Sequence, residues 1–181
     1  MKINSKWFTL IELLLASTLF FILVIMTYAN YAFYQNIARV KLSLKEISQS
    51  INTAKNMAVN WFDKNWINQS IWIYFDTNNK NVIKFYTFNY NFPIVLNENN
   101  FYSEKKLQDK VWIEYISWKN NVLIYFSSIY WVPSLYFVDV DWSLENLDLD
   151  ELDMIISFKE NPNFPLKREL KYIKNTNVID Y

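Results

Sequence analysis

The stretch that decides the fold is Trp7–Ala29, which reads WFTLIELLLASTLFFILVIMTYA. It carries a single charged residue, Glu12, and the next charged residue in the chain is Arg39. About twenty apolar residues, at a helical rise of ~1.5 Å each, are enough to cross the hydrocarbon core of a bilayer. Because an ionisable group inside such a segment is costly, we expect Glu12 to have a functional partner.

The composition narrows the classes of function. The chain has 181 residues and a formal net charge of zero, which fits one membrane segment plus one modest domain. A neutral chain has no overall electrostatic attraction to nucleic acid, so we expect no nucleic-acid partner. Cys and His are both absent, which excludes a typical zinc site and a Ser-His or Cys-His nucleophile. We therefore expect a protein that is not an enzyme.

Glycine is also absent, although a chain of this length would contain about 13 at an average usage of ~7%. Tryptophan, usually rare, occurs eight times. Trp66, Trp118 and Trp142 stand in polar stretches where a turn would favour glycine. Our hypothesis is that these positions are UGA codons, translated here as tryptophan, that the source organism reads as glycine. The alternative is a domain that is rich in tryptophan.

The N-terminal part of the chain divides into three segments. We predict a leader at residues 1–7, the transmembrane half of a helix at 8–30 and an amphipathic half at 31–62, because neither Pro nor Gly interrupts the pattern. Apolar residues in the second half recur at steps of three and four, which places them on one face. These residues are Ile37, Val40, Leu44, Ile47, Ile51, Ala54 and Ala58. We expect this stripe to pack on the chain's own sheet; a coiled-coil partner is the alternative.

The rest of the chain, residues 67–181, is predicted to be one β-rich domain. Runs of β-branched and aromatic residues between polar turns indicate short antiparallel strands. The predicted strands are 70–75, 82–90, 111–116, 122–127, 135–140, 154–159, 166–173 and 178–179. We expect one hairpin across DTNNKN (76–81) and a second, between 111–116 and 122–127, across SWKNN (117–121). The fold class is therefore α+β, with a long N-terminal helix packed on an antiparallel sheet.

An acidic stretch follows the predicted strand 135–140. Asp139, Asp141, Ser143 and Asp150 offer the hard oxygen ligands that calcium prefers, in a spacing that resembles the start of a calcium loop. However, Leu144 stands where such a loop needs glycine, and Asp150 stands where it has Glu. We expect a solvated turn and no cofactor, with calcium as the alternative.

The junction KWFTLIELLLAS at residues 6–17 resembles the prepilin signature of type IV pilins and of the pseudopilins of type II secretion. In that family a short basic leader ends in Gly and is followed by Phe-Thr-Leu-Ile-Glu at the start of a long apolar helix. The run from Phe8 to Glu12 matches in order, whereas Trp7 stands at the Gly position. Reading Trp7 as Gly would remove this difference. The resemblance covers about the first third of the chain; beyond it, some strings look like those of minor pseudopilins.

The resemblance implies a route of processing and assembly. A prepilin peptidase would cut between Trp7 and Phe8 and methylate the amine of Phe8. Glu12 would then pair with the N-terminal amine of an adjacent subunit; the alternative is that Glu12 only caps the helix. The implied partners are other pilin or pseudopilin subunits, the peptidase and an inner-membrane assembly platform.

The resemblance also implies a location, namely the bacterial inner membrane with a cytoplasmic leader, followed by a periplasmic or extracellular filament. The competing interpretation of the whole chain is a single-pass anchored β-domain that acts as a ligand-binding sensor or an enzyme. The mature N-terminus distinguishes the two, because only the pilin-like protein would begin at an N-methylated Phe8.

Overall fold

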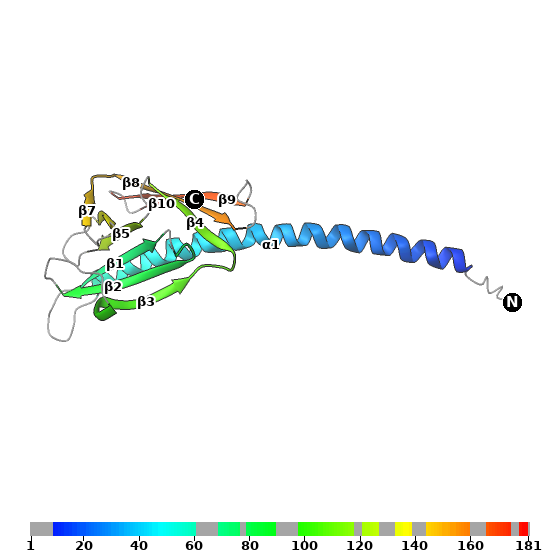
Figure 1. Ribbon diagram of the computed structural model, residues 1–181, viewed down its shortest axis with the longest axis horizontal. Coiled ribbons are helices and arrows are strands. Elements are labelled where there is room, and N and C mark those ends of the chain that lie inside the picture. The colour runs from blue at the N-terminus through cyan, green and yellow to red at the C-terminus, as the bar shows by residue number, and fades with distance from the viewer. Residues whose placement is uncertain are drawn as a thin grey trace. The chain divides into compact units, whose positions relative to one another are not determined.

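The computed structural model describes most of the chain (Figure 1). The described residues are 9–60, 69–76, 79–89, 98–117, 121–126, 133–138, 144–159, 166–174 and 178–180. The chain divides into two compact units, Met1–Ile37 and Ala38–Tyr181. One helix, α1 (Leu10–Asn60), contributes to both units and is 51 residues long.

The first unit contains the N-terminal part of α1, coloured blue in Figure 1. Its large apolar side chains are exposed, from Leu10 (80% exposed) to Tyr34 (67% exposed). A helix that exposes this much apolar surface needs an apolar environment outside the chain. The helix is long and apolar enough to cross a membrane, as the sequence predicts.

The second half of α1 is amphipathic and belongs to the second unit. Six of the seven predicted stripe residues are at most 3% exposed, and Ile37 is half-buried. Within this unit the helix is bonded to the turn after β3 (Phe101–Lys106). There Gln108 donates from its backbone N–H to Ser43 Oγ at 3.2 Å and from Nε2 to Glu46 Oε1 at 2.7 Å. The predicted packing of the amphipathic stripe within the chain's own domain is confirmed.

The strands form two antiparallel sheets. The six-stranded sheet has the order β3-β2-β1-β5-β6-β7, and the four-stranded sheet has the order β10-β9-β8-β4. The remaining strands are β1 (Gln69–Asp76), β2 (Val82–Asn89), β4 (Val111–Ile116), β5 (Asn121–Phe126), β6 (Ser134–Val138), β7 (Leu144–Leu147), β8 (Glu151–Phe158), β9 (Lys167–Ile173) and β10 (Val178–Asp180). A short 3₁₀ turn, η1 (Glu98–Asn100), precedes β3. The predicted α+β class, a long N-terminal helix with an antiparallel β-domain, is confirmed.

The first predicted hairpin is correct and the second is wrong. β1 and β2 pair directly, with Gln69 opposite Asn89. By contrast, β4 pairs with β8 in one sheet, whereas β5 lies between β1 and β6 in the other. At the end of β4, Ser117 has a positive φ of 32°, a conformation that takes the chain out of the extended strand. Two apolar runs beside each other in sequence therefore belong to different sheets.

Two further strands lie in stretches that we predicted as connections. β3 falls in the polar stretch before residue 111, and β7 falls in the acidic stretch after residue 140. Each is the last strand at one edge of the six-stranded sheet, and most of its side chains are exposed or half-buried. An edge strand of this kind lacks the apolar alternation that reveals a strand in sequence.

The central strand β1 is buried on both faces. Ile71, Ile73 and Phe75 point to one face of the six-stranded sheet, and Trp72 and Tyr74 point to the other, as strand alternation requires. Trp72 is 1% exposed and lies at the centre of an aromatic cluster. Its ring centroid is 4.5 Å from that of Tyr125, 5.5 Å from that of Phe88 and 5.6 Å from that of Tyr136.

The structure tests the glycine hypothesis at only two of the eight tryptophan positions. Trp72 and Trp112 lie within strands, and the six others lie outside the described residues. Among the described residues a positive φ occurs at Lys110 and Ser117 and not at either tryptophan. These two strand positions therefore do not require glycine, and the hypothesis for Trp7, Trp66, Trp118 and Trp142 stays a prediction.

Candidate functional site

The start of α1 is closed by a reciprocal pair of side chains. Thr9 donates to Glu12 Oε2 from its backbone N–H and from its hydroxyl, each at 3.0 Å. In return, Glu12 donates its backbone N–H to Thr9 Oγ1 at 3.3 Å, and also to the Thr9 carbonyl at 3.0 Å. This arrangement is a capping box, in which two otherwise unpaired donors at a helix start are satisfied. The interpretation of Glu12 as a cap is therefore seen in the single chain.

Among the residues that the structure describes, the charge of Glu12 has no counter-ion. The segment from Thr9 to Ala38 contains no Lys, Arg or His, so no side chain within it can neutralise the carboxylate. Both bonds from Thr9 go to the same oxygen, Oε2. A positive partner for Glu12 must therefore come from the amino-terminal side of Thr9 or from another molecule. Trp7 and Phe8, the predicted cleavage pair, lie outside the described residues.

The hydroxyls farther along the apolar segment are satisfied within the helix. Ser17 Oγ donates to the Leu14 carbonyl at 2.9 Å, and Thr27 Oγ1 donates to the Leu23 carbonyl at 2.7 Å. Thr18 also donates to carbonyls one turn earlier. Because these donors are paired inside the helix, Glu12 is the group in this segment that most needs an external partner.

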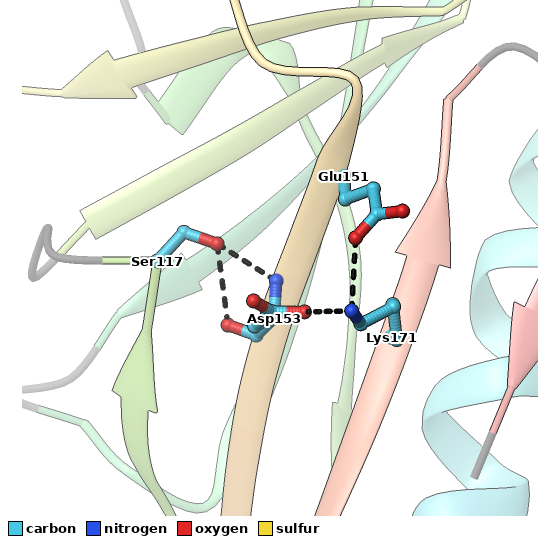
Figure 2. A network of polar contacts seen from close by, with 4 residues as sticks. All are labelled: Ser117, Glu151, Asp153 and Lys171. Atoms are coloured by element: carbon cyan, nitrogen blue, oxygen red, sulfur yellow. Dashed lines mark hydrogen bonds and ion pairs between the residues drawn. The ribbon is translucent and has the colours of Figure 1, made fainter.

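A second polar cluster lies in the four-stranded sheet (Figure 2). Ser117, after β4, binds the backbone of Asp153 on β8: Asp153 N–H donates to Ser117 Oγ at 2.7 Å, and Ser117 N–H donates to the Asp153 carbonyl at 2.9 Å. On β9, Lys171 Nζ donates to Glu151 Oε2 at 2.9 Å and lies 3.8 Å from Asp153 Oδ1. The contacts of this cluster connect β4 with β8 and β8 with β9.

This cluster contains a serine near a lysine, the residue types of a Ser-Lys hydrolase. The chemistry does not fit, because the hydrogen bond to Glu151 and the nearby charge of Asp153 raise the pKa of Lys171. A lysine kept protonated in this way cannot accept the proton of a serine hydroxyl. Ser117 is also buried, at 6% exposed, and its hydroxyl is bonded to backbone atoms of Asp153. We assign the cluster a structural role.

The distance of 3.8 Å between Lys171 Nζ and Asp153 Oδ1 is too long for a hydrogen bond. Asp153 Oδ1 is accordingly buried without a hydrogen-bond partner among the described residues. Its contact with Lys171 is therefore Coulombic, and the side chains of both residues are about two-fifths exposed. Such pairs contribute little to the free energy of unfolding, on the order of 0–1 kcal/mol.

The predicted calcium residues fall mostly outside the described part of the chain. Asp139, Asp141 and Ser143 lie there, whereas Asp150 is described and exposed. The carbonyl oxygen of Asp150 accepts the N–H of Lys174 at 2.8 Å. Within the described ranges no three Asp, Glu, His or Cys side chains are grouped so that they could hold a metal ion. The calcium loop stays a prediction.

The sequence contained a signal for the cap that we did not use. Thr9-Leu-Ile-Glu12, just before an apolar run, is the spacing of a capping box. Ser117 and Lys171 carried no comparable signal, because their partners are 36 and 20 residues away in the chain. Only the pairing of the strands brings them together.

The evidence on function comes from these residues, because comparison with known proteins found no match. No family model matches the chain, and no curated protein or solved structure matches it either.

Proposed function

We propose that this protein is a structural subunit of the pilin or minor pseudopilin kind, without catalysis of its own. A prepilin peptidase cuts it between Trp7 and Phe8 and methylates the new amine, and the subunit assembles from the inner membrane into a pilus or secretion pseudopilus. The observation that carries the proposal is the single helix α1. It joins an exposed apolar segment, whose one charge is Glu12, to a buried stripe in an antiparallel domain.

The exposed segment explains why assembly would be favourable. Before assembly, lipid covers the apolar side chains from Leu10 to Tyr34. After assembly, the same surface packs against the corresponding helices of neighbouring subunits, where close packing takes the place of lipid contacts. A soluble domain at the other end of the helix stays in water throughout. The two halves of α1 thus need different surroundings, and a filament with a helical core supplies both.

The charge of Glu12 explains how the subunits would align. Cleavage before Phe8 creates a positive amine, the kind of partner that a carboxylate in a low-dielectric core needs. The cap uses Oε2 of the carboxylate, so capping and pairing with the amine of a neighbour are compatible. An ion pair between adjacent subunits would set the axial offset between their helices.

The mature N-terminus tests the proposal. The full chain is expressed with a prepilin peptidase, and the N-terminal peptide of the membrane fraction is sequenced by mass spectrometry. We expect N-methyl-Phe8, and an increase in processing when Trp7 is replaced by Gly. A chain that keeps Met1 in both forms would overturn the proposal and favour the anchored sensor or enzyme.

Incorporation into a filament is the second part of the test. The chain contains no Cys, so a cysteine placed at Leu19, which is 58% exposed, is the only one available for cross-linking. We expect disulfide-linked products between two copies of this variant, and products with other pilin-like subunits when the cysteine carries a photoactivatable cross-linker. A cysteine at Asn146, on the exposed edge of β7, is the matched control and should not give the same products.

A further inference from the structure

The turn between β1 and β2 is bonded to the connection between β3 and β4 and to β4 itself. The turn between β1 and β2 offers two backbone carbonyls: that of Asn81 accepts the N–H of Leu107 at 2.8 Å, and that of Lys80 accepts the N–H of Ile113 at 2.8 Å. Leu107 begins the turn between β3 and β4, which lies beside α1 (Figure 1). The two turns therefore form one connected surface at one end of the second unit.

The end of β8 joins the same surface. Lys159 donates its backbone N–H to the carbonyl of Lys110 at 2.7 Å. The ammonium of Lys159 lies 4.6 Å from the ring centroid of Trp112, and that of Lys80 lies 5.4 Å from it. Two lysines from different sheets are thus held beside one half-buried indole. Among the described residues, no carboxylate lies within ion-pair distance of Lys80 or Lys159.

This surface lies at the end of the unit that α1 enters. The chain enters the unit at Ala38, and the turn between β3 and β4 is bonded to α1 through Gln108, which contacts Ser43 and Glu46. We call the cationic residues in the first turns of this part of α1, in the connected turns and at the ends of β3 and β8 the basic end. The basic end comprises Arg39, Lys41, Lys45, Lys80, Lys105, Lys106, Lys110 and Lys159, with Glu46, Asp76, Glu104 and Asp109 as the carboxylates among them.

The charge of the basic end is not a property of the whole chain. The formal net charge is zero, so an excess of cations at one end requires an excess of carboxylates elsewhere. Glu145, Asp148, Asp150, Glu151 and Asp153, on and between β7 and β8, supply much of it; we call them the acidic strip. An uneven distribution of this kind orients a protein toward a charged surface, even when its total charge is zero.

We propose that the basic end binds the head groups of anionic phospholipids and so holds the β-domain against the membrane before assembly. The exposed apolar run of α1 ends at Tyr34, and the cations begin at Arg39. Lysines and arginines directly after a membrane segment attract anionic lipid, and a tryptophan flanked by lysines suits the interface between lipid and water. This inference rests on the membrane anchoring in the proposed function.

The main competitor for the basic end is the acidic strip of a second copy. Anionic lipid fits the position better, because the basic end adjoins the residues through which the chain leaves the apolar segment. Lipid head groups surround that point in every anchored subunit, whereas a second copy reaches it only after association. The two partners respond differently to lipid composition and to protein density, so one experiment separates them.

The experiment uses the absence of Cys to attach one fluorophore to the full-length protein. Asn79→Cys places the label in the exposed turn beside Lys80, and Asn146→Cys places it on β7 as a control. Each protein is reconstituted into vesicles of phosphatidylcholine, with or without phosphatidylglycerol, that carry a quencher on a fraction of the head groups. We expect phosphatidylglycerol to increase quenching at position 79 and not at position 146. Salt should reverse the increase, because the Debye length falls from about 10 Å at 0.1 M to about 3 Å at 1 M.

Paired variants test whether location or total charge matters. Lys80→Gln with Lys159→Gln removes two charges from the basic end, and Lys55→Gln with Lys174→Gln removes two charges elsewhere, near the C-terminal end of α1 and at the end of β9. We expect the first pair to abolish the phosphatidylglycerol-dependent quenching at position 79 and the second pair to preserve it. Circular dichroism of each variant confirms that the domain is folded.

Three results would overturn the inference. The first is equal quenching at position 79 in both kinds of vesicle, in protein that resists alkaline extraction; the proposed anchoring would then survive alone. The second is quenching that follows protein density instead of lipid charge, which would identify the acidic strip of another copy as the partner. The third is protein that alkali extracts, which would remove the anchoring and this inference together.

Discussion

Thr9 and Glu12 are joined by hydrogen bonds in both directions, yet the two bonds that Thr9 donates end on one carboxylate oxygen. Oε2 of Glu12 accepts from the N–H and the hydroxyl of Thr9 at 3.0 Å each, and Thr9 Oγ1 accepts the Glu12 N–H at 3.3 Å. An amide oxygen could accept the same bonds without carrying a charge. The capping role and the charge of Glu12 can therefore be separated by substitution.

Glu12→Gln should fail to assemble, as Glu12→Ala should, if pairing with an amine is the function of the side chain. Gln keeps an oxygen for the Thr9 donors and loses the negative charge, whereas Ala loses both. We expect both variants to insert into the membrane, because each removes an ionisable group from the apolar segment. Filament incorporation is measured by shearing filaments from cells and comparing the subunit content with that of the membrane.

Thr9→Val is the matched control for the cap. It removes the hydroxyl of Thr9 and keeps the carboxylate of Glu12, so we expect incorporation close to that of the wild type. If Glu12→Gln assembles normally and Thr9→Val does not, the side chain of Glu12 acts as a cap and its charge is not needed.

Ser117→Ala should destabilise the β-domain more than Ser117→Gly. Both changes remove the oxygen that accepts the Asp153 N–H, and a buried donor left unpaired costs about 1–3 kcal/mol. Glycine tolerates the φ of 32° at this position, whereas alanine does not do so without strain. Urea unfolding of the two variants in the same detergent gives the comparison. Equal midpoints for the two variants would show that the backbone at Ser117 is not strained.

The free energy of unfolding should decrease at alkaline pH because of buried tyrosines. Burial raises the pKa of Tyr172, and burial followed by the charge of Asp76 raises the pKa of Tyr74 and Tyr86. The folded state therefore holds its phenolic protons more tightly than the unfolded chain, whose tyrosines titrate near pH 10. The stabilisation is complete below pH ~10 and is lost as pH rises from there toward the folded-state values.

Tyr172→Phe isolates one of these groups. Phenylalanine has no proton to lose, so the variant should show a shallower decrease above pH ~10 than the wild type. The measurement is the urea midpoint at a series of pH values, with each protein compared with its own value at neutral pH. Parallel decreases in the two proteins would assign the pH dependence to other groups.

Peptide sequencing of the protein from its source organism tests the glycine hypothesis position by position. We expect glycine at Trp118 and Trp142, which stand in polar stretches, and at Trp7 in the unprocessed precursor, because the proposed cleavage removes Trp7 from the mature subunit. Tryptophan at Trp118 and Trp142 would end the hypothesis. Trp72, which lies within β1 with its side chain 1% exposed among aromatic rings, is a position where glycine is not expected.

What could be predicted from sequence depends on how far apart in the chain the interacting residues are. α1 is local: its period, its lack of Pro and Gly, and its apolar stripe are all contained in one continuous segment. The hairpin of β1 and β2 is nearly as local, since six residues separate the predicted strands. The partner of β4 is not local, because β8 begins 35 positions after β4 ends and several apolar strands compete for the same pairing.

The polar sites show the same difference between contacts that are local in sequence and contacts that only the tertiary fold creates. The relation between Thr9 and Glu12 spans three positions and follows from a known spacing. The basic end draws on α1, on the turn between β1 and β2, on the connection between the two sheets after β3, and on the end of β8. No periodicity links Lys80 with Lys159, and neither is conspicuous in a chain with 18 basic residues. Only the tertiary fold brings these two lysines beside the same indole.

The polar strand β3 has a consequence for aggregation. It ends in Glu104, Lys105 and Lys106 at one edge of the six-stranded sheet, where unpaired backbone groups would otherwise offer a template for a foreign strand. Charged side chains on an edge discourage such pairing, since a second copy would bring like charges together. In the proposed subunit, association then takes place through the apolar helix, and strand pairing between copies is disfavoured at this edge of the sheet. Growth would be directed along the helices, and amyloid-like stacking of the β-domains at this edge would be suppressed.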